Sequence, residues 1–181
     1  MAGRGCRPCR GPGREGPVSP LSSLPHLDEA GQARMVDVSG KEPTRRTARA
    51  SGALRMTATA LEAVLGGELP KGDALAVARV AGIMAAKRTA EIVPLCHPLP
   101  LDHVAVELTP DRELPGLRVQ TEIVTVARTG AEMEALTAAA ASLLALYDMA
   151  KSLDRGMVIE SVRLESKAGG ASGTFVRDEG A

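Results

Sequence analysis

Aromatic side chains are nearly absent from this chain of 181 residues, in which Tyr147 and Phe175 are the only two. A core without aromatic rings has to be filled by Leu, Val, Ile, Met and Ala, so we expect an aliphatic core with closely packed elements. Proteins that bind single-stranded nucleic acid stack its bases on aromatic faces. With 22 basic and 22 acidic residues, the formal net charge is also zero. Both observations argue against a nucleic-acid partner.

The order of the helix and strand patterns predicts an α+β protein rather than a regular alternation of strand and helix. Apolar residues at helical spacing predict a short helix over residues 58–65 and two long helices over residues 74–91 and 131–153. Thr129 and Glu132 resemble a capping box at the start of the longest helix. Strands are expected at residues 35–38, 52–56, 103–108, 117–126, 157–165 and 173–177. This order favours an antiparallel sheet with helices packed on one face.

The composition changes near residue 25. Residues 1–24 are rich in Arg, Gly, Pro and Ser and poor in apolar side chains, which predicts a disordered extension. Residues 25–181 are expected to form a single domain. Cys6 and Cys9 form a C-x-x-C pair, but only His26 lies nearby as a further zinc ligand, so an inert extension is favoured over a metal site.

The expected compartment is a reducing cytoplasm. The three cysteines do not form a disulfide framework, and the arginines near the N-terminus precede no apolar block of the kind found in secretory signals. No uninterrupted apolar run reaches the length of a membrane span, so no membrane partner is expected.

The stretch from Glu91 to Pro100 is an apolar connector that contains three prolines and the pair Cys96-His97. Proline fixes φ and lacks a backbone donor, so neither a helix nor a central strand continues through this stretch. A rigid connector that holds a thiol and an imidazole beside the core is a good position for a functional site. From these residues alone, an apolar loop whose histidine is merely hydrogen-bonded is the favoured interpretation.

Charged side chains recur in the predicted loops and at the predicted helix ends. Lys71 precedes a helix N-terminus, which attracts anions, and Asp148 and Lys151 are neighbours three residues apart on a helix. The basic segment Thr44–Ala50 can present guanidinium groups to phosphate. Cations around an anionic ligand, together with a carboxylate and an imidazole for proton transfer, suit chemistry on a phosphorylated small molecule.

The sequence resembles the cyclic pyranopterin monophosphate synthase family, the accessory protein C of molybdenum cofactor biosynthesis. The resemblance extends in order from about His26 to the C-terminus. Its most specific parts are Leu95-Cys96-His97-Pro98 and the run from Glu132 to Thr137. The other matching stretches are residues 35–38, 71–73, 81–83, 85–89, 129–131, 147–149 with Lys151, and 167–170.

This resemblance implies a ferredoxin-like fold and a homohexamer, a trimer of dimers with the active site at a dimer interface. The implied activity is that of a phosphorus–oxygen lyase. It converts the nucleotide-derived substrate 3′,8-cyclo-7,8-dihydroguanosine 5′-triphosphate to cyclic pyranopterin monophosphate and pyrophosphate. No organic cofactor and no bound metal site are expected. The sequence leaves open whether Mg²⁺ accompanies the triphosphate.

The resemblance also implies roles for individual residues. Asp148 matches the family's catalytic aspartate, Lys71 is the leading candidate for proton transfer, and Lys151 is a second acid–base or electrostatic partner. His97 would hydrogen-bond the polyphosphate or donate a proton. The expected substrate-binding residues are Leu95, Cys96, His97, Glu132, Met133 and Glu134, together with the cations Lys41, Arg46, Lys87 and Lys167, which would neutralise the triphosphate and the leaving pyrophosphate.

Three other interpretations remain. A binding module for a phosphorylated ligand would use the same basic residues without turnover. An enzyme with Cys96 as nucleophile would need a covalent step that the implied reaction does not require. A scaffold protein would bind metal through Cys6 and Cys9.

Overall fold

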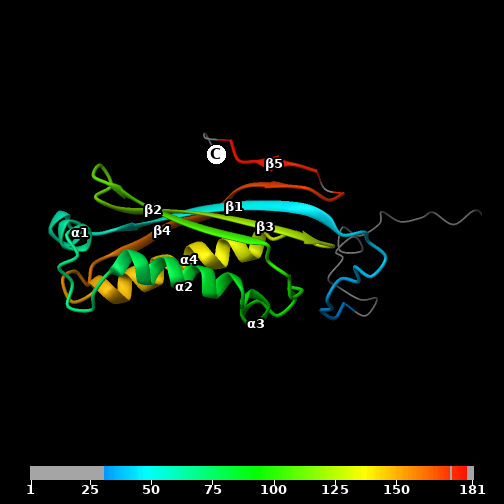
Figure 1. The fold of residues 1–181 in the computed structure, drawn as a ribbon, viewed down its shortest axis with the longest axis horizontal. Coiled ribbons are helices and arrows are strands. Elements are labelled where there is room, and N and C mark those ends of the chain that lie inside the picture. The colour runs from blue at the N-terminus through cyan, green and yellow to red at the C-terminus, as the bar shows by residue number, and fades with distance from the viewer. Residues whose placement is uncertain (1–30, 172, 179–181) are drawn as a thin grey trace, which may run out of the picture. The chain divides into compact units, whose positions relative to one another are not determined.

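The computed structural model describes residues 31–171 and 173–178, and the chain divides into two units, residues 1–36 and 37–181. The predicted disordered extension, with Cys6 and Cys9, lies outside the described residues. The second unit carries nine helices and strands within its described part (Figure 1). These are β1 (Thr44–Arg55), α1 (Ala58–Leu65), α2 (Ala74–Ala86), α3 (Thr89–Ile92), β2 (His103–Asp111), β3 (Gly116–Ala127), α4 (Glu132–Ala150), β4 (Val158–Ala168) and β5 (Phe175–Val176).

The five strands form one antiparallel sheet in the order β2-β3-β1-β4-β5. The central strand β1 pairs on both sides, so that Ala50 lies opposite Thr121 of β3 and opposite Leu164 of β4. One helical connection leads from β1 to β2 and another, α4, leads from β3 to β4. This is the split β-α-β arrangement of ferredoxin-like folds. With α2 and α4 against one face of the sheet (Figure 1), the α+β prediction is confirmed.

The core is aliphatic, as the sequence predicts. Its largest fully buried apolar side chains are Leu54, Leu61, Leu117, Val119, Ile123, Leu143 and Leu146. Small residues bring α2 and α4 close together: a β-carbon at Gly82 would lie 2.9 Å from the carbonyl oxygen of Ala138 and closer still to the hydroxyl of Ser142. Close approach of backbones therefore replaces large side chains in filling this layer.

Helix α4 meets the length and composition of a membrane span, with a mean hydropathy of 1.2 over its apolar window. Half of that window is buried inside the structure, and the helix packs on α2 and on β1, β3 and β4. The apolar composition of α4 is therefore explained by its packing in the protein core.

Several expected boundaries are wrong. Residues 35–38 have no regular secondary structure, because a turn follows in which the Asp37 carboxylate accepts from the Ser39 N–H at 2.8 Å. Strand β1 begins at Thr44, so the basic segment Thr44–Ala50 belongs to the sheet. The helix predicted over residues 74–91 is interrupted at Lys87–Arg88, after which the Thr89 hydroxyl donates to the carbonyl of Ala86 at 3.1 Å and α3 begins.

Candidate functional site

A cationic pocket of about 310 Å³ lies at one edge of the sheet. The register explains its position: Thr44 lies opposite Ala127, and Thr47 lies opposite Ala168. The start of β1 therefore meets the ends of β3 and β4, next to the start of α4. The charged side chains that line the pocket are Lys41, Arg46, Arg128, Lys167 and Glu132. Four cations with one carboxylate make the pocket suited to an anionic ligand.

The Arg46 guanidinium is held in this pocket by two backbone carbonyls. Its Nε donates to the carbonyl oxygen of Ala127 at 2.9 Å, and its Nη2 donates to the carbonyl oxygen of Arg128 at 3.1 Å. Both acceptors lie where β3 ends. A guanidinium held by its own main chain needs little reorganisation when an anion arrives.

Glu132 and Lys167 form an ion pair across the pocket, with the Lys167 Nζ 2.9 Å from the Glu132 Oε1 and both side chains about a quarter exposed. The predicted capping box is therefore wrong: α4 begins after Ala131, and no side chain in the described part of the chain caps its N-terminus. Gly130 leaves room for the Glu132 carboxylate, since a β-carbon there would lie 2.7 Å from its Cδ. The acid faces the lysine instead of the helix terminus.

The connector that contains Cys96 and His97 is fastened to β3. The Thr125 hydroxyl donates to the carbonyl oxygen of Pro100, and the N–H of Asp102 donates to the carbonyl oxygen of Val124 at 2.9 Å. The Asp102 carboxylate in turn accepts from the N–H of Val126 at 2.8 Å. The predicted connector is thus confirmed for residues 93–100, because Glu91 and Ile92 belong to α3. Cys96 and His97 are both half-buried in it.

Glu134, on the first turn of α4, is the buried acid of this region. Its side chain is only 4 % exposed, and burial raises its pKa to about 7, with the negative charge of Glu132 adding to the rise. Burial also raises the pKa of the Cys96 thiol, and the charge of Glu134 adds to that effect. A carboxyl group that exchanges its proton near neutral pH therefore lies close to Cys96.

Lys71, Asp148 and Lys151 form a second charged group, the Lys–Asp–Lys cluster. The Lys71 Nζ lies 2.7 Å from the Asp148 Oδ2, and the Lys151 Nζ lies 2.7 Å from the Asp148 Oδ1. Lys71 also donates to the main-chain carbonyl of Asp148 at 2.9 Å. Hydrogen bonds from Lys151 and then from Lys71 lower the pKa of Asp148 to about 2, so it is ionised at neutral pH.

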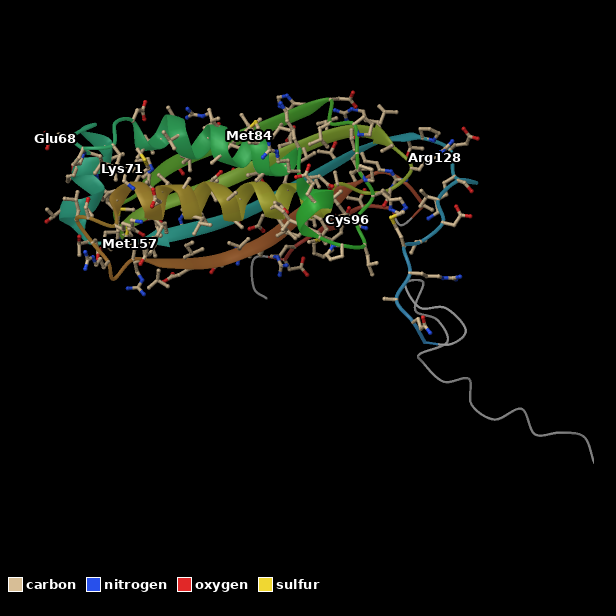
Figure 2. All side chains as sticks on the ribbon, turned by 90° about the horizontal axis from the view of Figure 1, so that it is seen from below. Glu68, Lys71, Met84, Cys96, Arg128 and Met157 are labelled. Carbon is tan, nitrogen blue, oxygen red and sulfur yellow. The ribbon has the colours of Figure 1, made fainter. Side chains whose placement is uncertain are left out.

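The predicted site residues fall into two groups at opposite ends of α4. Glu132 begins the helix beside the cationic pocket, and Asp148 lies in its last turn. Sixteen residues of helix at about 1.5 Å each separate them by about 24 Å. Figure 2 shows the same separation, with Lys71 near one end of the helical layer and Cys96 and Arg128 near the other. One copy of the chain does not bring the two groups together.

The other predicted residues are Leu95, Met133 and Lys87, which lie on three different segments. Leu95 is half-buried in the connector, Met133 is 38 % exposed on α4, and Lys87 is exposed where α2 ends. Arg128 is the charged pocket residue that was not predicted from the sequence. Its signal was the expected strand end just before the loop Arg128-Thr129-Gly130. Within the described ranges, no group of three or more His, Cys, Asp or Glu side chains is arranged to hold a metal ion.

Comparison with known proteins identifies the family. The profile of the MoaC family matches residues 35–170. A cyclic pyranopterin monophosphate synthase from Nostoc sp. is 58 % identical over 154 residues, covering 85 % of this chain and 92 % of that protein. Proteins of the same name from Pelotomaculum thermopropionicum and Thermomicrobium roseum are 55 % and 54 % identical, over 87 % and 88 % of this chain and 92 % and 96 % of their own lengths. The chain therefore belongs to the MoaC family, the family of the cyclic pyranopterin monophosphate synthases.

Proposed function

We propose that this protein is a cyclic pyranopterin monophosphate synthase. It converts 3′,8-cyclo-7,8-dihydroguanosine 5′-triphosphate to cyclic pyranopterin monophosphate and pyrophosphate, as a phosphorus–oxygen lyase of molybdenum cofactor biosynthesis. The observation that carries the proposal is the cationic pocket, which in a chain of this family offers four cations to a triphosphate.

The pocket supplies the charge that the phosphate chemistry needs. When a sugar hydroxyl attacks the innermost phosphorus, the bond to the leaving pyrophosphate breaks and negative charge accumulates on its oxygens. Arg46 and Lys167, both only partly exposed in the pocket, stabilise this charge, with Lys41 and Arg128 beside them. Lys87, exposed at the end of α2, adds positive charge to the approach.

Rearrangement of the purine-derived ring to the pterin requires proton transfers. In the Lys–Asp–Lys cluster, one carboxylate that stays ionised holds two ammonium groups within 2.7 Å. Lys71 delivers and accepts protons, while Asp148 orients it and Lys151 maintains the local charge. Glu134, Met133, Leu95, Cys96 and His97 line the ring-binding side, where Glu134 can exchange a proton near pH 7.

The complete active site is formed by two copies of the chain. The cationic pocket contains none of the three cluster residues, and about 24 Å of α4 separates the two groups. A partner that brings its Lys–Asp–Lys cluster to the pocket of the first copy would complete the site. We propose a homohexamer built as a trimer of such dimers. Because its substrate is made from guanosine triphosphate, we propose that the protein works in the cytoplasm.

Turnover of the purified protein tests this proposal. The substrate is the cyclised guanosine triphosphate, and pyrophosphate release and pterin fluorescence after oxidation are measured with and without Mg²⁺. Lys71→Ala should abolish both signals while the fold and the oligomer persist. Arg112→Ala, which removes another exposed ion pair, with Glu62, is the control and should keep full turnover. Saturable binding of the substrate without turnover by the parent protein would instead identify a binding module.

A further inference from the structure

Gly170 lies against the Arg46 guanidinium in a conformation that few other residues adopt. Its φ is +74°, in the left-handed region. A β-carbon at this position would lie 2.6 Å from Cζ and 2.8 Å from Nη2 of Arg46, and closer still to Nη1. All three of these atoms belong to the guanidinium, so the space beside Gly170 is the space that the charged group occupies.

We propose that Gly170 is a positioning residue for Arg46, which it keeps in place to bind the pyrophosphate portion of an anionic ligand. The main-chain carbonyls of Ala127 and Arg128 hold the Nε and Nη2 of the guanidinium, and the bare Cα of Gly170 allows the loop to lie against it. The N–H groups of Nη1 then donate hydrogen bonds to the ligand. This inference rests on the proposed function, because it assigns the anion bound in the cationic pocket.

Alanine at Gly170 is expected to displace the Arg46 guanidinium rather than the main chain, because of the atoms that its β-carbon would contact. At Gly170 it meets the far end of a flexible side chain, which can move away at little cost to the fold. The guanidinium would then give up its two carbonyl partners and its position. At Gly169, where φ is +98°, a β-carbon would instead lie 3.2 Å from the Cα of Arg46 and closer still to the carbonyl oxygen of Arg45, so the main chain would have to shift.

Gly173 provides a matched control. It follows in the same loop with φ +69°, so alanine there meets nearly the same backbone strain as alanine at Gly170. Among the described residues other than its chain neighbours, no heavy atom lies within 4 Å of a β-carbon built at Gly173. Gly170→Ala and Gly173→Ala therefore share the conformational penalty, but only Gly170→Ala collides with Arg46.

The test is a double-mutant cycle on the full-length protein with inorganic pyrophosphate as the probe. Calorimetry gives the dissociation constant for the parent, Gly170→Ala, Gly173→Ala, Arg46→Ala and the double variant Arg46→Ala/Gly170→Ala. Thermal unfolding is recorded for each. Gly170→Asn is added because asparagine tolerates a positive φ but keeps the β-carbon. If Gly170→Ala folds poorly, the binding measurements on Gly170→Asn replace it.

We expect Gly170→Ala and Gly170→Asn to weaken pyrophosphate binding by about tenfold or more, as loss of a charge-assisted contact does. Gly173→Ala should change it less than about twofold while losing similar thermal stability. With Arg46 already replaced by alanine, the Gly170 substitution should have almost no further effect on the dissociation constant.

Three results would overturn the inference: equal effects of Gly170→Ala and Gly173→Ala, a Gly170 effect that persists without Arg46, or no measurable binding of pyrophosphate by the parent. Turnover separates this outcome from that of the proposed function. A protein that shows the expected cycle but no synthase activity retains the role of Gly170 and loses the proposed reaction. A protein that turns over but shows no coupling loses only the role of Gly170.

Discussion

The Lys71 ammonium group lies 2.7 Å from the Asp148 carboxylate, although 77 residues separate them in the chain. Lys71 lies two residues before Asp73, which caps α2 by accepting from the N–H of Ala76, and Asp148 lies in the last turn of α4. Because α2 packs against α4, the start of one helix meets the end of the other. Lys151 completes the cluster from the residue that follows α4.

Replacement of Asp148 by asparagine tests whether the charge of this carboxylate is needed. Asn keeps the shape but removes the anion that both lysines share, so we expect kcat to fall by about 100-fold or more, in the range of lost acid–base groups. Because both lysines and Asp148 are about half exposed, stability should change little. Glu62→Gln at the exposed pair with Arg112 is the control. Full activity of Asp148→Asn would remove it from the mechanism.

Mixed oligomers test whether the site is shared between two copies. Lys71→Ala damages one end of α4 and Arg46→Ala the other, so we expect each variant alone to be nearly inactive. When the two variants are co-expressed in equal amounts, half of the dimers should be hybrids. Each hybrid has one of its two sites intact, so about a quarter of the parent activity should return. Activity that stays at the level of the single variants after confirmed subunit mixing would place the whole site within one copy.

Glu134 should make stability depend on pH in an unusual direction. Its pKa rises from 4.5 to about 7 on folding, so between these values the native state binds more protons than the unfolded state. The free energy of unfolding should therefore decrease as pH rises from about 4.5 to 7, by about 1 to 3 kcal/mol, and level off above. Urea unfolding at several pH values measures this.

The variant Glu134→Gln provides the comparison for that titration. An amide keeps the size of the side chain but carries no charge at any pH, so this decrease should be absent and the variant should be more stable than the parent at pH 8. If both proteins lose the same free energy across the interval, another group is responsible.

Gly82→Ala should destabilise the fold by about 1 to 3 kcal/mol, as overpacking does. The added methyl group would contact the carbonyl oxygen of Ala138 at 2.9 Å and Val106 at 3.1 Å, besides the Ser142 hydroxyl. Addition of Ser142→Ala should recover part of the loss by removing one of these contacts. A stabilised Gly82→Ala protein would mean that the gain in helix propensity outweighs the crowding between α2 and α4.

The sequence was most informative where a pattern is local. The helical spacing of apolar residues predicts α4, and the strands expected at residues 103–108 and 117–126 lie within β2 and β3. The family resemblance adds the ferredoxin-like topology and the roles expected of individual site residues. The strand at residues 35–38 was wrong because Asp37 satisfies a turn with its own side chain.

Other errors come from contacts between distant segments. Thr129 and Glu132 have the spacing of a capping box, but Lys167, distant in sequence, takes the Glu132 carboxylate. The basic segment at the start of β1 is a strand because it pairs with the end of β3 at Ala127 on one side and with the end of β4 at Ala168 on the other. Arg128 has no motif of its own; the sequence indicates only that a strand ends shortly before it, and the register then places it in the pocket.

The scarcity of aromatic residues gives this protein a built-in optical probe. With no Trp in the chain and Tyr147 its one tyrosine, intrinsic fluorescence comes from a single known position. Tyr147 is the immediate neighbour of Asp148, and its hydroxyl donates to the carbonyl oxygen of Arg155 at 3.0 Å, which ties α4 to the segment leading into β4. Unlabelled protein therefore reports events at the Lys–Asp–Lys cluster through its own emission, without an added dye.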